Sequence, residues 1–167
     1  MSHYFLLIII MLYYLKTHYT QQTLRKFEQM AQHFFDIKVF AEDTDYGGIV
    51  YHANYLKYME RARTEWLNSI GISLQLMVSQ NVLFVVRQAN LQFHKSALLN
   101  DIVTIQSTVS LIKNTRLFFK QQVVKKDMPS IIYCTGDVEV VCIKHNDKKP
   151  IRLPNEIINC LNSESNG

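Results

Sequence analysis

The stretch AEDTDYGGIVYHANYLKYMERAR, from Ala41 to Arg63, changes character halfway along. Its first half holds two aspartates, paired glycines and a histidine, and its second half repeats apolar residues at helical spacing. Asp45 therefore stands just before a glycine turn that leads into a helix. Free N–H groups at a helix N-terminus, helped by the helix dipole, can polarise a carbonyl or hold an oxyanion. The stretch predicts half of an acyl-transfer site or, alternatively, a turn that Asp43, Thr44 or Asp45 merely caps.

The helix predicted after this turn is amphipathic. Its apolar stripe is formed by Tyr55, Met59, Ala62, Trp66 and Ile70. We place the charged residues on the opposite, exposed face: Lys57, Glu60, Arg61, Arg63 and Glu65. Gly71 follows where a C-terminal cap belongs, so the helix is expected to end just before it.

Strand patterns surround this helix. One precedes it at residues 33–41, and four long ones follow it, at residues 82–97, 101–112, 115–126 and 130–145. A second, short helix is expected at Ser73–Gln80 and a terminal helical turn or two at residues 153–161. Four strands in meander order after a strand and a helix predict an α+β fold in which the long helix covers one face of an antiparallel sheet.

Composition narrows the class of protein. A chain of 167 residues with 48% hydrophobic content predicts one globular domain. The net charge of +4 is spread over interspersed residues of both signs, so no nucleic-acid partner is expected. The cysteines, Cys134, Cys142 and Cys160, are odd in number and lack CxxC spacing. They indicate small core residues in a reducing compartment rather than a disulfide framework or a zinc site.

The N-terminal region stands apart. Its uncharged apolar run, Tyr4 to Leu15, has twelve residues, fewer than the roughly 20 that cross a bilayer. A signal peptide would need a positive region before the run and small residues after it, and both are missing. Three readings stay open: a membrane or export segment, a helix that packs on the domain, and an upstream extension with Met30 as initiator, which we favour. We expect an extension at 1–29, a domain at 30–161 and a tail at 162–167.

Several common motifs do not fit the opening stretch. An EF-hand beginning at Asp43 would need an oxygen ligand and a glutamate where Gly47 and Asn54 stand. His52 has no histidine or cysteine at zinc-ligand spacing. The paired glycines lack the rest of a dinucleotide or phosphate-binding loop, and there is no GxSxG elbow. No metal and no cofactor is expected.

The segment EDTDYGGIVYHANYLKYMERARTEWL resembles the signature of hotdog-fold acyl-CoA thioesterases of the 4-hydroxybenzoyl-CoA thioesterase type. It is particularly close to the YbgC-like branch, which is associated with the Tol–Pal system, and the similarity extends weakly from about Phe35 to Leu161. The resemblance implies a curved antiparallel sheet wrapped around the long helix. It also implies a homodimer or homotetramer with active sites at the subunit interface, and a cytoplasmic, membrane-peripheral enzyme of lipid metabolism.

The resemblance assigns roles in catalysis to two residues. Asp45 aligns with the family's carboxylate, which either attacks the thioester carbonyl or acts as general base on water. His52 aligns with the position whose backbone N–H points at the thioester oxygen, and its imidazole is also implicated. The leaving thiol has a pKa near that of cysteine, about 8.5, and therefore departs with little protonation. A site with few catalytic groups is then sufficient.

Further residues of the motif have implied supporting roles. Gly47 and Gly48 shape the turn at the substrate, and Tyr51 and Tyr55 either line the acyl pocket or belong to the core. Asp43 is expected to be structural. Glu60 and Arg63 are expected to form an ion pair of the scaffold. The candidates for binding the CoA phosphates, none preferred over the others, are Arg87, Lys95, Lys113 and Arg116.

The function predicted from these residues is hydrolysis of an acyl thioester of CoA or acyl carrier protein. Two alternatives are a non-catalytic hotdog protein that binds acyl thioesters and a hotdog hydratase or dehydratase. A binder would need no carboxylate at position 45, and a hydratase usually carries a different motif.

Overall fold

The computed structural model describes residues 32–163. The expected N-terminal extension with its apolar run, the last four residues and the side chain of Cys160 lie outside the described part. Within it, no helix combines the length and the apolar character needed to cross a membrane.

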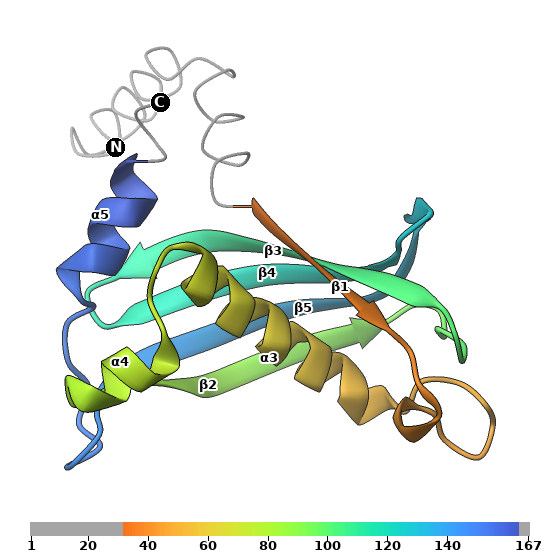
Figure 1. Ribbon diagram of the computed structural model, residues 1–167, viewed down its shortest axis with the longest axis horizontal. Helices are drawn as coiled ribbons and strands as arrows, with labels where there is room; N and C mark the ends of the chain where they lie inside the picture. The colour runs from red at the N-terminus through yellow and green to blue at the C-terminus, as the bar shows by residue number, and fades with distance from the viewer. Residues whose placement is uncertain (1–31, 164–167) are drawn as a thin grey trace, which may run out of the picture.

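A five-stranded antiparallel sheet forms the body of the domain (Figure 1). Its strands are β1 (Gln32–Lys38), β2 (Val82–Phe93), β3 (Ile102–Lys113), β4 (Arg116–Lys125) and β5 (Met128–Lys144). All of the pairings are antiparallel, and the strand order is β1-β3-β4-β5-β2. The α+β class with a curved sheet around one long helix is confirmed.

The predicted meander is right for β3, β4 and β5 and wrong for β2. β2 pairs with β5 rather than with β3, as Ala89 opposite Val138 shows. In a meander, β2 would pair with β3. In the structure β1 pairs with that edge of β3 instead, with Asp36 opposite Thr104. The connection from β2 to β3 must therefore cross the end of the sheet, at residues 94–101. This crossing brings that connection to the start of the long helix.

The long helix α3 (His52–Ser69) lies across the concave face of the sheet (Figure 1). Four residues of its predicted apolar stripe are buried, and the fifth is partly buried: Tyr55, Met59, Ala62, Trp66 and then Ile70. Gly71 follows in a left-handed conformation with φ of 78°, which confirms the predicted end of the helix.

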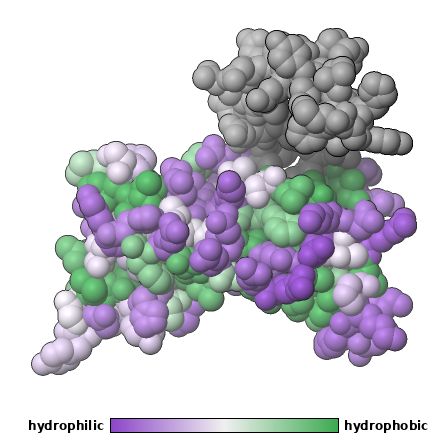
Figure 2. Space-filling model, turned by 180° about the vertical axis from the view of Figure 1, so that it is seen from behind, coloured by the Kyte–Doolittle hydropathy of each residue, from purple (hydrophilic) through white to green (hydrophobic). Residues whose placement is uncertain are grey.

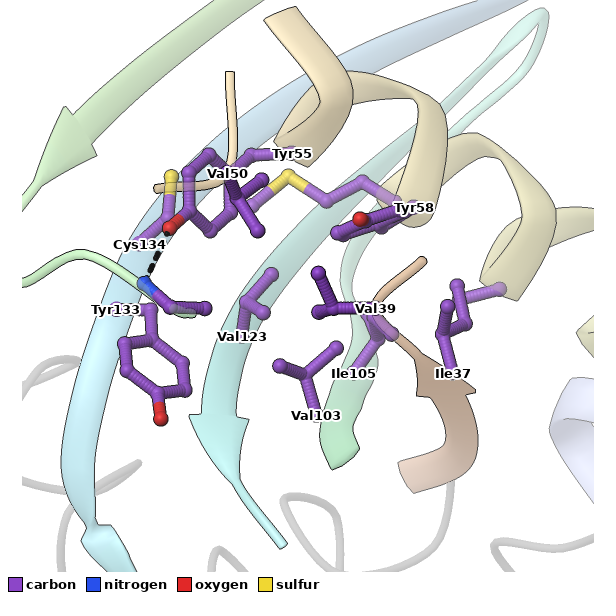
Figure 3. Close-up of a cluster of buried hydrophobic side chains, with 13 residues drawn as sticks. Ile37, Val39, Val50, Tyr55, Tyr58, Val103, Ile105, Val123, Tyr133 and Cys134 are labelled. Atoms are coloured by element: carbon purple, nitrogen blue, oxygen red, sulfur yellow. Dashed lines mark hydrogen bonds between the residues drawn. The ribbon is translucent and has the colours of Figure 1, made fainter. Parts of the chain in front are cut away.

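Two apolar clusters pack α3 onto the sheet. The first surrounds Tyr55, Tyr58 and Met59 and includes side chains of β1, β3, β4 and β5 (Figure 3). The second surrounds Trp66 and Leu67, nearer the helix C-terminus. It also receives the two shorter helices, α4 (Leu74–Ser79) and α5 (Asn155–Ser163). Both were expected from the sequence.

A buried polar network lies between the clusters and corrects one prediction. Arg63, which we placed on the exposed face of the helix, is only 5% exposed. Its guanidinium donates to Gln121 Oε1 at 2.6 Å and to the Glu60 carboxylate, the expected ion pair. Gln121 Nε2 donates in turn to Met59 O at 3.0 Å and to Ser107 Oγ at 2.8 Å. The arginine is buried because the sheet presents an amide that pairs with it.

The two cysteines with described side chains, Cys134 and Cys142, are free and buried in β5. Burial raises the pKa of both thiols to about 11, so they stay protonated near neutral pH. Their prediction as small core residues is confirmed.

The face of the sheet opposite α3 carries mixed side chains. Figure 2 shows hydrophilic groups with apolar ones between them, and no single continuous apolar area on this side. The alternation expected of a half-covered sheet is visible in β4, where Gln121 and Val123 are buried and Lys120 and Gln122 are exposed.

We expect Arg63→Met to lower the free energy of unfolding by about 1–3 kcal/mol, because Gln121 would keep a buried amide oxygen without its donor. Arg61→Met is the matched control: Arg61 is exposed on the same helix, and its effect should stay within about 0.5 kcal/mol. Urea denaturation followed by circular dichroism measures both. Equal effects would show that the network adds no specific stability.

Candidate active site

The segment before α3 is a tight hairpin that begins at Asp45. The Asp45 N–H donates to Ile49 O at 2.9 Å, and the Gly48 N–H donates to Asp45 O at 2.9 Å. Gly48 has a φ of 74°, in the left-handed region that favours glycine. The turn predicted from the paired glycines is therefore present, with Asp45 at its first position.

The Asp45 side chain is exposed and held from one side. Its Oδ1 accepts a hydrogen bond from the Gly47 N–H at 2.8 Å. A Cβ at position 47 would approach that oxygen to 3.1 Å, so glycine leaves the carboxylate room. Oδ2 makes no hydrogen bond within residues 32–163 and is available to a substrate or to water.

Asp43 ties the hairpin to the helix. Its carboxylate accepts from the Phe40 N–H at 2.9 Å, and its backbone oxygen accepts from the Tyr51 N–H at 2.9 Å and from Asn54 Nδ2 at 2.8 Å. Burial, followed by the nearby Asp43 charge, raises the pKa of Tyr58 far above its usual range. Asp43 is thus a buried structural residue, as expected, whereas Asp45 is exposed.

His52 is the first residue of α3. The Asn54 N–H donates to Tyr51 O at 2.8 Å, but the amides of His52 and Ala53 make no hydrogen bond to any described residue. Two backbone donors at the positive end of the helix dipole are therefore free for an oxyanion, close in sequence to Asp45. The His52 ring is exposed and lies against the rings of Tyr51, at 4.4 Å between centroids, and Phe93, at 6.2 Å.

Phe93 was not identified from the sequence. It ends β2, some forty residues after His52, and reaches the site because β2 lies along the edge of the sheet under the start of α3. No local pattern singles it out; only the strand order does. Its ring also lies 5.8 Å from that of Tyr55, and Phe93 is 53% exposed.

The two tyrosines of the motif differ in burial. Tyr51 is 46% exposed beside His52, whereas Tyr55 is 3% exposed. The Tyr55 hydroxyl oxygen accepts from the Ala97 N–H at 3.0 Å, the bond drawn as a dashed line in Figure 3. Tyr55 thereby anchors the connection between β2 and β3. That either tyrosine contacts the substrate stays a prediction.

The same connection is fixed at a second point. Asp101 accepts from the Leu98 N–H and from the Tyr133 hydroxyl, both at 2.9 Å. Partial burial alone would raise the pKa of this carboxyl, but the hydrogen bonds and nearby Lys125 outweigh burial and lower it. The loop therefore holds an ionised carboxylate and is rigidly placed beside the hairpin of Asp45.

Of the four cationic residues named for the CoA phosphates, Lys95 lies in the connection between β2 and β3, two residues after Phe93, and the other three make contacts on the sheet. Arg87 and Arg116 each donate to Glu139 at 2.9 Å, and the Lys113 ammonium lies over the Phe118 ring, 5.3 Å from its centroid. Within the described residues, no group of three or more histidine, cysteine, aspartate or glutamate side chains is placed to hold a metal ion.

A cavity of about 440 Å³ lies at the other end of α3, between α3, α4 and β2. None of the residues predicted for the site lines it. Its polar lining consists of Glu60, Arg63 and Thr64. Its apolar lining includes Trp66, Leu67, Met77, Phe84, Phe119 and Val140. Trp66 belongs to the predicted apolar stripe of α3, but the sequence did not show which strand lies opposite it, so the cavity was not predicted.

An exposed carboxylate at a glycine turn, followed along the chain by a helix whose first amides are free, has the chemical groups that acyl transfer requires. A family model described as the thioesterase-like superfamily matches residues 39–161. The chain belongs to this superfamily.

Relatives and solved structures agree. The acyl-CoA thioester hydrolase YbgC of Escherichia coli O6:H1 is 37% identical over 122 residues, which cover 73% of this chain and 90% of that protein. The acyl-CoA thioesterase YbgC of Haemophilus influenzae is 34% identical over 74% of this chain and 89% of its own length. The crystal structure of a probable thioesterase from Bartonella henselae superposes with a TM-score of 0.70 at 34% identity, covering 74% of this chain and all of that one. The predicted resemblance to the YbgC-like branch is confirmed.

We expect Gly48→Ala to lower the free energy of unfolding by about 1 kcal/mol more than Gly48→Asn, because asparagine tolerates the left-handed region better than alanine. No atom lies within 4 Å of a Cβ added at this position, so crowding does not enter the comparison. Thermal denaturation of the two variants measures the difference. Equal stabilities would show that the hairpin does not need its left-handed residue.

Proposed function

We propose that this chain is an acyl-CoA thioesterase that hydrolyses an acyl thioester to the free acid and CoA. The observation that carries the proposal is the exposed carboxylate of Asp45 at the start of the hairpin that leads into α3, whose first two amides, those of His52 and Ala53, are free of bonds to described residues. The similarity to proteins named acyl-CoA thioester hydrolase over most of the chain supports it.

The proposed reaction begins with the thioester oxygen at the helix start. The His52 and Ala53 amides donate to this oxygen and stabilise the negative charge that develops there. On the nucleophilic route, an Asp45 oxygen forms a bond to the carbonyl carbon while the C–S bond breaks and thiolate leaves. Water then hydrolyses the mixed anhydride. On the general-base route, Asp45 takes a proton from a water molecule that attacks the carbonyl carbon itself, after which the C–S bond breaks and the thiolate leaves.

The exposed His52 imidazole is proposed to assist proton transfer. It is exposed beside Tyr51 and Phe93, so a bound substrate could reach it. Gly47 and Gly48 keep this approach free of side chains, and Tyr51 supplies an exposed ring beside it.

The enzyme is proposed to work as a homodimer, or a dimer of dimers, joined through β2. β2 is an edge strand of twelve residues, and Val85 to Asn90 are all exposed. A long open edge is normally covered or paired, because its unpaired N–H and C=O groups invite another strand. A second copy that pairs β2 with β2 would satisfy both edges at once.

We place this enzyme in the cytoplasm, because Cys134 and Cys142 are free thiols, as a reducing compartment favours. We assign the activity to residues 30–161. Exposed apolar side chains near the hairpin, among them Phe40, Leu98 and Leu99, would also suit peripheral contact with a lipid surface.

The full chain, and the protein beginning at Met30, should release thiol from acyl-CoA, and Asp45→Asn should lower kcat/KM by at least ~10². A colorimetric thiol assay over acetyl-, butyryl-, palmitoyl- and benzoyl-CoA measures this, with circular dichroism to confirm folding. Asp137→Asn is the matched control, because Asp137 is exposed on the outer face of β5. A single turnover in water enriched in ¹⁸O tests the nucleophilic route: label in Asp45 requires an anhydride whose aspartyl carbonyl is attacked by water, and the general-base route labels the product acid alone.

Other outcomes of the same assay would redirect the proposal. Binding without thiol release, on CoA and then on acyl-carrier-protein substrates, would favour a non-catalytic binding protein. Consumption of an enoyl substrate with the thioester intact would favour a hydratase.

Sedimentation velocity should give a particle of two or four chains at micromolar concentrations. The physical reason is the open β2 edge, which a single chain leaves unpaired. A particle of one chain that still turns over substrate would contradict both the pairing and an active site at a subunit interface.

A further inference from the structure

Tyr58 carries a buried hydroxyl group that has no role in the site described so far. The residue lies on α3 in the first apolar cluster, fully buried, with its ring centroid 6.2 Å from that of Tyr55 (Figure 3). Its hydroxyl oxygen makes no hydrogen bond of ordinary geometry to a described residue. A phenylalanine would fill the same space without this group. Because a buried polar atom without a partner costs stability, the hydroxyl calls for an explanation.

The polar group that acts most strongly on this hydroxyl is the Asp43 carboxylate. Burial is the largest cause that raises the pKa of Tyr58, and the charge of Asp43 and its approach to hydrogen-bonding reach come next. Of the two Asp43 carboxylate oxygens, only Oδ2 accepts an ordinary hydrogen bond within the described residues, from the Phe40 N–H. A donor without a full acceptor therefore lies next to an acceptor that can take another hydrogen bond.

Asp43 controls the position of the hairpin. Its backbone oxygen accepts from the Tyr51 N–H at 2.9 Å and from Asn54 Nδ2 at 2.8 Å, so it joins one arm of the hairpin to the other arm and to the first turn of α3. Asp45 follows two residues later in the same arm, and its N–H donates to Ile49 O. Fixing the side chain of Asp43 thus fixes where the Asp45 carboxylate lies relative to the start of α3.

Tyr58 belongs to the packed body of the domain, whereas the hairpin does not. Tyr58 lies six residues after His52, so about 9 Å further along the helix axis. The cluster around it includes side chains of β1, β3, β4 and β5. Residues 45–48 of the hairpin, by contrast, are all exposed. A bond from Tyr58 would therefore attach an exposed hairpin to a fixed point of the core.

We propose that Tyr58 is a positioning residue of this enzyme: its hydroxyl donates to the Asp43 carboxylate when substrate is bound, and this bond sets the Asp45 carboxylate against the thioester carbonyl carbon. The inference rests on the proposed thioesterase function. In the free enzyme the bond is incomplete. Substrate held by both the amides at the start of α3 and Asp45 draws the hairpin toward the helix and completes it. Tyr58 acts through Asp43 and takes no part in the bond changes.

The first test removes only the hydroxyl. Tyr58→Phe in the full chain should lower kcat by ~10-fold or more with KM unchanged, because a group misplaced by about 1 Å can cost ~10²-fold in rate. The melting temperature should not fall, since the free enzyme has no ordinary hydrogen bond to lose there. The thiol-release assay, run with the acyl-CoA that the parent turns over fastest, gives kcat and KM, and thermal denaturation gives the melting temperature.

Tyr133→Phe is the matched control for a hydroxyl with a structural bond. Tyr133 is also buried, and its hydroxyl donates to Asp101 at 2.9 Å. Loss of this bond should lower the melting temperature by about 2–4 °C. If Tyr58→Phe loses melting temperature together with activity, the Tyr58 hydroxyl is structural and the positioning role is wrong.

A double-mutant cycle tests whether Tyr58 acts through Asp43. Asp43→Ser leaves one oxygen for the Phe40 N–H, and Asp43→Asn replaces it if circular dichroism shows that the serine variant does not fold. Tyr58→Phe and Asp43→Ser should each lower kcat, and the double variant should fall no further than Asp43→Ser alone. Losses that multiply in the double variant would show that the two residues act independently, which overturns the route through Asp43.

Two further outcomes separate this inference from the proposed function. A parent protein that releases no thiol overturns the thioesterase function and the inference with it. A parent that turns over substrate, with Tyr58→Phe at the same kcat, overturns the inference alone and leaves the thioesterase standing.

Discussion

One backbone hydrogen bond joins the two halves of the site: the Val50 N–H donates to Ala97 O at 2.9 Å. It attaches the hairpin of Asp45 to the loop that crosses the end of the sheet, and the N–H of the same Ala97 donates to the Tyr55 hydroxyl oxygen. Without the crossing, the hairpin would have no strand-like partner, and the free amides at the start of α3 would face an unsupported turn. The position of the hairpin therefore depends on the strand order, in which β2 lies at the far edge of the sheet and β1 occupies the edge of β3.

The two nearby aspartates, Asp43 and Asp45, differ in the roles open to them because they differ in burial. Asp43 is buried, and a hydrogen bond from the Phe40 N–H to its carboxylate replaces the contacts with water that burial removes. Asp43 therefore stabilises the segment that leads into α3. Asp45, two residues on, is exposed and keeps one oxygen without a hydrogen bond to a described residue. A thioester needs little more than such a carboxylate and an oxyanion site, since its thiol leaves readily. The sparse constellation is consistent with the chemistry proposed for it.

Local patterns predicted much of this structure, and long-range pairing explains what they missed. The stripe that buries Tyr55, Met59 and Trp66 and the turn at Gly48 are properties of a few consecutive residues. Arg63 was wrongly expected on the surface, because its burial depends on Gln121, fifty-eight residues away. The place of Phe93 at the site and the cavity could not be predicted for the same reason. Both depend on where β2 lies in the sheet, and the alternation of polar and apolar residues does not determine the strand order.

The open edge of β2 connects the fold to the function proposed for it. In a single chain this edge leaves six consecutive exposed residues, Val85 to Asn90, a feature that natural sheets usually protect. Here it also borders the cavity, whose lining includes Val85 and Val86. A second copy on this edge would pair the open strand and cover its exposed residues at the same time. The pairing proposed for the enzyme would therefore also stabilise the sheet, because it satisfies backbone groups that one chain leaves open.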